Sequence, residues 1–254
     1  MKVFKNLRKK LIEDKKIRSY IPYAIGEIIL VVIGILIALA INNANLRSIK
    51  SQKERVYLEG LHKEFSTSKS KLSELIQVNK NNYEGAKKIV KYMDQSSLTV
   101  SEKELSHHLF TSLAFDISFN PNNSLLLEMM SSASLKDLSN SELRVRLTNW
   151  LSTLEDITNQ EADLRVQREK ILDIFRNQYS IRTVFDQAGV SENEIGIGLK
   201  KNFKSNLALL NSLEFENNLL LFILTSIATE KSHYQPLMIE LEIILSLLER
   251  EIGS

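Results

Sequence analysis

Few side chains of this 254-residue chain have the types and spacing that catalysis or metal binding requires. The sequence has no cysteine, which excludes thiol nucleophiles, thiolate metal sites and disulfides. Glu104 and His107 have the i, i+3 spacing that places two metal ligands on one helix face, but a two-metal bundle site needs such a pair on two helices. No HExxH, GxSxG or phosphate-loop pattern occurs. We therefore expect the chain to be no enzyme and to hold no metal or cofactor.

Two charged residues interrupt an apolar stripe in the second half of the chain. From Glu142 to about Phe185 there is no glycine or proline, and apolar residues recur every three or four positions, as on one helix face. The stripe comprises Leu143, Leu147, Trp150, Leu154, Ile157, Glu161, Leu164, Arg168, Ile171, Phe175 and Gln178. Glu161 and Arg168 are two turns apart on it, and we expect them to pair with other helices and fix the register of a bundle. Its aromatic residues, which we interpret as core rather than as the lining of a ligand pocket, are Trp150, Phe175 and Tyr179.

The third unusual charge is Glu27, which lies inside the apolar segment from Ile21 to Ile41. A helix of about 20 apolar residues spans a bilayer, so residues 21–41 are predicted to form a transmembrane helix. A carboxylate in hydrocarbon costs about 2–3 kcal/mol. Glu27 therefore either reaches the interface or is protonated near the positive end of the helix, or it contacts a partner or a second copy inside the membrane. Gly34 and Ala38, both small, would allow that close approach.

The charges around this segment predict its direction. Residues 1–18 hold eight basic and two acidic residues, and the rest of the chain is mildly acidic. Lysine and arginine next to a span remain cytoplasmic, so we expect residues 1–20 to form a cytoplasmic arm on the anionic inner leaflet. Residues 42–254 are then a periplasmic domain of an inner-membrane protein. A short arm that leads directly into an apolar helix argues against nucleic acid as the partner.

A cleaved signal peptide is the alternative to this anchor. Ala38-Leu39-Ala40 fits the small-x-small pattern of a cleavage site. Cleavage there would require a signal of 40 residues, whereas signals usually have about 15–30 with a much shorter apolar region. We therefore favour an uncleaved anchor.

The residues of the apolar segment also carry a family resemblance. Tyr23-Ala24-Ile25-Gly26-Glu27-Ile28-Ile29-Leu30-Val31-Val32-Ile33-Gly34-Ile35-Leu36-Ile37-Ala38-Leu39, followed by Ile41-Asn42-Asn43, resembles the N-terminal signature of an uncharacterised bacterial family. Ser139-Asn140-Ser141-Glu142-Leu143-Arg144 is similar to family members as well, whereas Ala40 and Ala44 depart from them. The resemblance implies a single-pass inner-membrane protein with a helical domain outside the membrane. It implies no activity.

The remaining sequence predicts an all-α fold. Three prolines and eight glycines are few for this length, which favours long helices. A stripe that includes Ser68, Asn79 and Asn82 predicts that the transmembrane helix continues as a coiled-coil-like helix to a polar break at residues 94–100. The stripe comprises Leu58, Leu61, Phe65, Ser68, Leu72, Leu75, Asn79, Asn82, Ala86, Ile89 and Met93.

Turn and capping residues then predict where the later helices begin. Ser101 and Glu104 form a capping box for a helix that ends near Ala114. A turn at residues 120–123 precedes a helix over about 124–138, and Ser139 or Ser141 caps the long helix described above. Gly189 ends that region, and Ser191 with Glu194 offers a further cap. A last helix over about 203–250 is kinked or divided at Pro236. Helices joined by short connections pack as an antiparallel bundle.

We therefore interpret the chain as a membrane-anchored helical interaction or scaffold protein without catalysis. Its partners would be the lipid bilayer and a protein partner or second copy, bound through the span or the bundle. The alternative is an extracytoplasmic sensor or ligand-binding module that acts through a partner in the membrane. A closed polar cavity would favour the alternative, whereas a solid apolar core with an exposed apolar patch would favour scaffolding.

Overall fold

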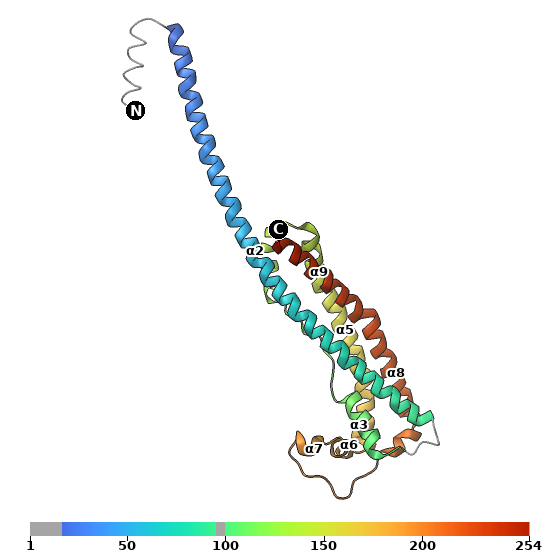
Figure 1. The fold of residues 1–254 in the computed structure, drawn as a ribbon. Helices are drawn as coiled ribbons and strands as arrows, with labels where there is room; N and C mark the ends of the chain where they lie inside the picture. Colours follow the sequence, from blue (N-terminus) through green and yellow to red (C-terminus); the bar gives the residue numbers. More distant parts are fainter. Residues whose placement is uncertain (1–16, 95–99, 254) are drawn as a thin grey trace. The chain divides into compact units, whose positions relative to one another are not determined.

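The computed structural model describes residues 17–94 and 100–253, and within these ranges all regular elements are helices (Figure 1). This confirms the predicted all-α class. The chain divides into two compact units between Val56 and Tyr57. Residues 1–16, which contain most of the predicted basic arm, lie outside the described residues.

Helix α2 (Ile17–Asp94) contributes to both units. In the first unit its apolar segment is exposed: from Ile21 to Ile41 every described side chain except the half-buried Ala24 faces outward. By length and composition α2 is the one described helix that could cross a membrane. A helix that is apolar all round and packs against nothing in its own chain is typical of a membrane span.

In the second unit the apolar distribution along α2 changes to a single stripe. Nine of the eleven predicted stripe positions are buried, and Leu75 and Met93 are half-buried. Ser68, Asn79 and Asn82 are as deeply buried as their apolar neighbours. The predicted 3-4 periodicity therefore identifies the buried face of α2, and α2 ends at Asp94, where the polar break was predicted.

Helix α3 (Glu102–Leu113) begins at the predicted capping box. The Ser101 hydroxyl accepts a hydrogen bond from the Glu104 N–H (3.2 Å), and the Glu104 carboxylate accepts one from the Ser101 N–H (3.0 Å). A Cβ atom on Gly85 of α2 would lie 2.4 Å from the Ser112 Oγ of α3. This close approach requires a residue without a side chain at position 85.

The predicted helix over 124–138 is wrong in its second half. Helix α4 (Ser124–Ser131) ends, Ala133 adopts a left-handed backbone (φ 55°), and a 3₁₀ turn η1 (Ser134–Asp137) follows. The Ser132 hydroxyl and N–H both donate to the Glu128 carbonyl. Local hydrogen bonds from serine compete with helix continuation, which explains the early end.

The long central helix is also shorter than predicted. Helix α5 (Ser141–Gln178) is capped by Asn140, whose Oδ1 accepts from the Leu143 N–H (3.0 Å), and neither Ser139 nor Ser141 is the cap. It ends before Ser180, which caps the separate helix α6 (Ile181–Gln187). The Asn206 amide pairs with both the N–H and the carbonyl of Ser180, each at 2.9 Å. This tertiary contact holds the backbone of Ser180 out of the helix.

Three further elements correct the predicted C-terminal region. Helix α7 (Val190–Asn193) follows Gly189, which has a left-handed backbone (φ 79°). Ser191 is therefore no cap, and its hydroxyl donates to Asp186. Residues 194–206 are irregular, and the 3₁₀ turn η2 (Leu207–Asn211) and helix α8 (Leu213–Thr229), capped by Ser212, follow. The predicted helix start near Phe203 is wrong.

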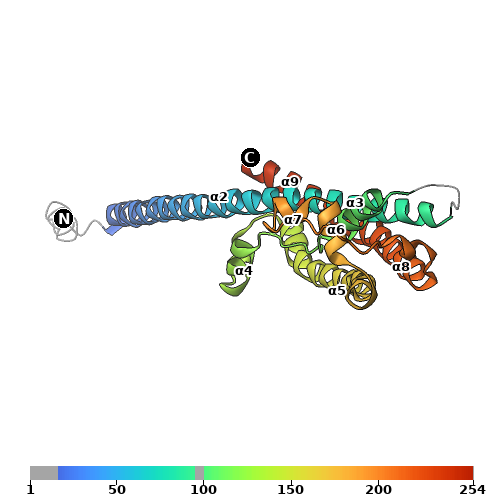
Figure 2. The same ribbon diagram turned by 90° about the horizontal axis from the view of Figure 1, so that it is seen from below.

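The predicted division at Pro236 is confirmed. A π-helical turn, η3 (Glu230–Tyr234), separates α8 from α9 (Gln235–Gly253), and Pro236 lies in the first turn of α9. Proline donates no N–H, so the ordinary i→i−4 bond to the Ser232 carbonyl is missing here. Helices α8 and α9 both pack against α5, and Figure 2 shows α8 beside α5. The core that they share with α2 and α3 is one contiguous apolar cluster.

The contact between Gly85 and Ser112 gives a test of this packing. Gly85→Ala should lower the free energy of unfolding by about 1–3 kcal/mol, because the new methyl group collides with the buried Ser112 hydroxyl. Adding Ser112→Ala removes the colliding atom, and the double variant should regain stability and exceed the wild type, since alanine favours a helix by about 1 kcal/mol over glycine. Urea unfolding of the full chain, followed by circular dichroism, measures both. Additive effects of the two substitutions would contradict the contact.

Candidate functional site

The most deeply buried charged residue that the structure describes is Glu161, on α5, with 3% of its surface exposed. Its Oε1 accepts a hydrogen bond from the Tyr234 hydroxyl (2.6 Å) and another from the Phe119 N–H (2.8 Å). Tyr234 belongs to the π-helical turn η3, and Phe119 to the connection between α3 and α4. One carboxylate oxygen thus joins three segments that are distant in sequence.

Burial dominates the electrostatics of this pair. It raises the pKa of the Glu161 carboxyl above its ordinary 4.5, while the hydrogen bonds from Tyr234 and Phe119 and the charge of Arg165 oppose the rise. Burial and the Glu161 carboxylate together raise the pKa of Tyr234 strongly, so the phenol keeps its proton and remains the donor. Because neither group reaches solvent, the pair has no access to a substrate and acts within the fold.

Arg168, the other charged residue of the α5 stripe, contacts the end of α3. Its Nε donates to the Leu113 carbonyl (2.8 Å), and its guanidinium forms an ion pair with Glu169 (3.1 Å). A cation on the unpaired carbonyls of a helix C-terminus is favourable. Glu161 and Arg168 therefore each contact other segments, and their role in setting the bundle register stays a prediction.

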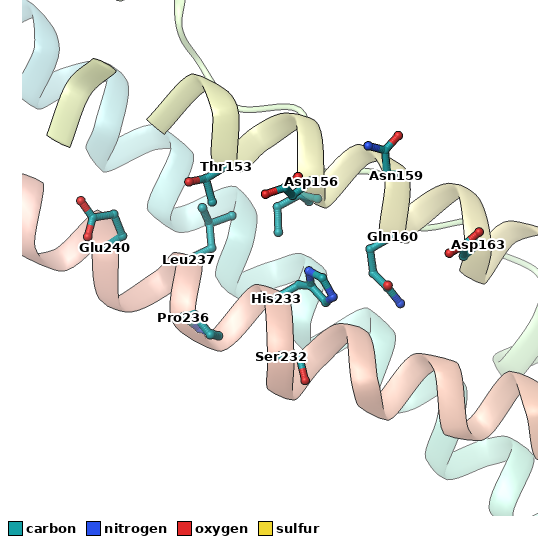
Figure 3. A pocket seen from close by; sticks show the side chains of 11 residues that line it. Thr153, Asp156, Asn159, Gln160, Asp163, Ser232, His233, Pro236, Leu237 and Glu240 are labelled. Carbon is teal, nitrogen blue, oxygen red and sulfur yellow. The ribbon is translucent and has the colours of Figure 1, made fainter. Parts of the chain in front are cut away.

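A groove of about 620 Å³ lies along α5, η3 and α9 (Figure 3), and its lining includes Gln160 and His233, the sequence neighbours of Glu161 and Tyr234. Its lining comprises Thr153, Asp156, Ile157, Asn159, Gln160, Asp163, Ser232, His233, Pro236, Leu237 and Glu240. His233 projects from η3 into the space between the helices, on the side of Asp156 and Gln160 (Figure 3). Glu240 is neutralised by Arg146 at 2.8 Å. The groove is open and mildly acidic.

Among the described residues, the groove does not assemble a metal-binding arrangement. Within residues 17–94 and 100–253, no group of three or more potential ligand side chains is placed to hold a metal ion. The Glu104 carboxylate is engaged by the Ser101 cap, and the His107 ring contacts the His108 ring (5.3 Å between centroids) instead of a second ligand pair. The predicted Glu104–His107 spacing therefore corresponds to a helix surface.

A second hollow, of about 210 Å³, lies between α3, α5 and α6. It is lined mainly by apolar side chains, among them Phe110, Leu172, Phe175 and Phe185, with Arg168 at its edge. Trp150 is not part of it: its ring packs on Phe65 (5.2 Å between centroids), and its Nε1 donates to the Asn123 Oδ1 (3.0 Å). The aromatic stripe of α5 is thus mainly core, and only Phe175 reaches a hollow.

The predicted intramembrane residues Glu27, Gly34 and Ala38 are all exposed on the part of α2 that belongs to the first unit. They are separated by seven and four residues, which places them on one face of the helix. A Cβ atom on Gly34 would meet nothing within 4 Å. The face that they share is open to a partner.

A family model described as a family of unknown function (DUF6090) matches residues 27–180, more than half of the chain. The chain belongs to this family. The matched range includes Ser139–Arg144 and all but the first four residues of Tyr23–Leu39, the two stretches that carried the resemblance in the sequence. No curated protein and no solved structure matches the chain. Membership of DUF6090 therefore brings no activity, ligand or partner with it.

Two structural features of this DUF6090 protein had little sequence signal. Tyr234 as the partner of Glu161 depends on a contact across 73 positions, although Pro236 marked the break that produces the π-helical turn. The contact between Asn79 and Ser226, in which the Asn79 Nδ2 donates to the Ser226 carbonyl (2.9 Å), was equally hidden. Only the polar residues in the α2 stripe indicated that something polar had to face them.

The Glu161 carboxyl gives a pH-dependent test. Because its pKa is higher in the folded state than in the unfolded state, the folded chain binds more protons between pH 4.5 and that raised pKa. The unfolding free energy of the wild type should therefore fall as pH rises through this window, and Glu161→Gln should remove the decline, since its carbonyl oxygen can still accept both hydrogen bonds. Urea unfolding at about pH 5 and about pH 8 measures the difference.

Tyr234→Phe is the matched comparison. It removes one donor from a buried carboxylate, which should cost about 1–3 kcal/mol near neutral pH and steepen the decline with pH. Parallel pH profiles for the wild type, Glu161→Gln and Tyr234→Phe would contradict the assignment.

Proposed function

We propose that this protein is a single-pass, membrane-anchored helical interaction protein that performs no catalysis. The observation that carries the proposal is the exposure of the apolar segment from Ile21 to Ile41, in which no side chain that the structure describes is buried. Twenty apolar residues in water are strongly unfavourable, and a bilayer is the environment that matches a helix of this length. An uncleaved anchor is the simplest interpretation, because the segment is about twice as long as the apolar region of a typical signal peptide.

The direction of the anchor follows from charge. With the basic arm on the cytoplasmic face of the inner membrane, residues 42–254 form a periplasmic domain. Eight basic residues before the segment outweigh Arg47, Lys50, Lys53 and Arg55 after it. The arm would also contact the anionic lipids of the inner leaflet.

The proposed partner contact in the membrane is the face formed by Glu27, Gly34 and Ala38. Two small residues one turn apart let a second helix approach closely, and a carboxylate in hydrocarbon needs a hydrogen-bonding partner. A second copy of the chain or another transmembrane helix would meet both conditions.

The second unit supports an interaction role more than a sensing role. Its core is filled by a contiguous apolar cluster, and the hollows described above are open grooves rather than closed polar cavities. The outer face of α8 exposes Leu213, Leu220, Leu221 and Leu224. Such a patch is typical of protein contacts. A ligand-binding sensor, the alternative, would depend on the acidic groove of Figure 3.

Location and direction are tested together by a C-terminal fusion to a reporter that is active only outside the cytoplasm. The full-length fusion should be active and should remain in the membrane pellet after alkaline carbonate extraction. A stable but inactive fusion would reverse the proposed direction. An active fusion that carbonate releases in a shortened form would establish cleavage near Ala40 and overturn the anchor.

Glu27→Leu tests the contact in the membrane. Cross-linking in native membranes followed by mass spectrometry should show loss of a major cross-linked species, about tenfold weaker than in the wild type, if an interhelical hydrogen bond of about 1–2 kcal/mol is removed. Ile29→Leu, on the opposite face of α2, is the matched control and should leave the pattern unchanged. Identical cross-linked species in the wild type and Glu27→Leu would exclude Glu27 from partner binding.

A further inference from the structure

The irregular connection between α7 and η2, residues 194–206, exposes more apolar surface than a loop normally does. Ile195 (49% exposed), Ile197 (39%), Leu199 (52%) and Phe203 (47%) all face outward. Connections between helices usually have about 2–8 residues, and longer irregular loops are usually functional or disordered. This loop is held in place at several points, which excludes the second explanation.

The first half of the loop is fixed by Asp186 of α6, whose carboxylate is 5% exposed. Asp186 accepts hydrogen bonds from the Arg182 Nε (2.7 Å), the Ser191 hydroxyl and the Lys200 backbone N–H (3.1 Å). Arg182 also donates to the Gly198 carbonyl. These donors hold the pKa of Asp186 below its ordinary range despite the burial of its carboxylate. The Asp186 carboxylate therefore stays ionised at neutral pH.

The second half is fixed by buried polar groups as well. The Thr183 hydroxyl, on a residue 1% exposed, donates to the Lys204 carbonyl (2.7 Å). Asn206, fully buried, pairs with the backbone of Ser180, and its own N–H donates to the Glu102 carboxylate. The loop is thus a preorganised backbone that presents apolar side chains to solvent.

The charges on the loop indicate what covers those side chains. Lys200, Lys201 and Lys204 lie between or beside Leu199 and Phe203, and the one acidic residue of the loop, Glu194, lies at its start. The Lys204 Nζ donates to the Gln178 carbonyl (2.6 Å), whereas Lys200 and Lys201 are exposed. Exposed aliphatic and aromatic side chains next to lysines are the combination that binds the boundary between anionic headgroups and acyl chains.

We propose that residues 195–204 form a docking loop for an anionic phospholipid surface, with Ile195, Ile197, Leu199 and Phe203 inserted between the headgroups and the lysines on the phosphates. A protein partner fits less well, because the centres of protein interfaces are depleted in lysine. A nucleic acid fits less well, because no aliphatic side chain is needed to bind a phosphate backbone. The contact belongs to the second unit and does not depend on whether residues 21–41 span a membrane.

The absence of cysteine from the sequence permits a site-specific test. In the full chain, held in nanodiscs of phosphatidylcholine, Leu199→Cys is labelled with an environment-sensitive nitrobenzoxadiazole dye. Vesicles of phosphatidylcholine with about one-third phosphatidylglycerol are then added, and the dye emission should rise about two- to threefold and shift to the blue. Pure phosphatidylcholine vesicles should have little effect, and added salt should reverse the rise.

Variants separate the charged and apolar contributions. Lys200→Gln with Lys201→Gln should weaken vesicle binding about thirtyfold, as expected for two lysines near an anionic surface. Phe203→Ser should weaken it about tenfold. Leu127→Cys, labelled in the same way, is the matched control, because Leu127 is as exposed as Leu199 (52%) and lies on α4, which contains no lysine, and its emission should stay constant.

Three outcomes would overturn the proposal. The emission of the dye at position 199 could stay unchanged on anionic vesicles, rise equally on neutral vesicles, or be matched by the dye at position 127. In each case carbonate extraction of the fused chain still reports on the anchor, so failure of the docking loop and failure of the proposed function remain distinguishable.

Discussion

Helices α3, α4, α5, α8 and α9 all contact the part of α2 that belongs to the second unit, and this shared contact governs how the bundle is built. Phe65 contacts Trp150 of α5, Gly60 lies against Leu125 of α4, and Gly85 lies against Ser112 of α3. At the edges of the stripe, Lys69 pairs with Glu242 of α9 at 2.9 Å. The apolar area that is buried supplies the stability, since exposed ion pairs contribute at most about 1 kcal/mol each. A change in the stripe would therefore be felt by several helices at once.

The same stripe contains polar residues that an optimally stable core would lack. Asn79 and Ser226 share one hydrogen bond, but the Asn79 Oδ1 and the Ser226 Oγ are buried without a partner in the described structure. Each such group costs about 1–3 kcal/mol. Glu161 is better satisfied, because its Oε1 accepts from both Tyr234 and Phe119. Buried polar groups of this kind oppose a shift of one helix past another, since any other register leaves more of them unpaired.

Local patterns predicted those features of the fold that local physics determines. The 3-4 spacing identified the buried face of α2, the Ser101–Glu104 pair identified the start of α3, and Pro236 identified the division before α9. The predictions are wrong where a residue distant in sequence determines where a helix ends. Asn206 ends α5 by binding the backbone of Ser180, and no property of residues 142–185 contains that information.

The candidate sites divide in the same way. Glu27, Glu161 and Arg168 were recognisable because each is a charge in an apolar pattern, which is visible in the sequence. Tyr234 and the docking loop were not recognisable in the sequence, because their roles depend on which side chains are buried and which are exposed. Ile195 and Leu199 would read as ordinary core residues, and Asp186 as a surface acid, until the structure shows that the acid is buried and the apolar residues are exposed.

The combination of a buried acid and exposed apolar side chains distinguishes the docking loop from the other two exposed apolar surfaces. The segment from Ile21 to Ile41 is a regular helix with apolar side chains on all sides, a pattern that is typical of a membrane span. The leucines of α8 occupy one helix face, for which another helix is the natural partner. The loop has neither regular backbone hydrogen bonding, which the bilayer interior would demand, nor a continuous face for a helix. Its apolar side chains alternate with lysines on a fixed backbone, and the headgroup layer is the environment in which both kinds of side chain are satisfied at once.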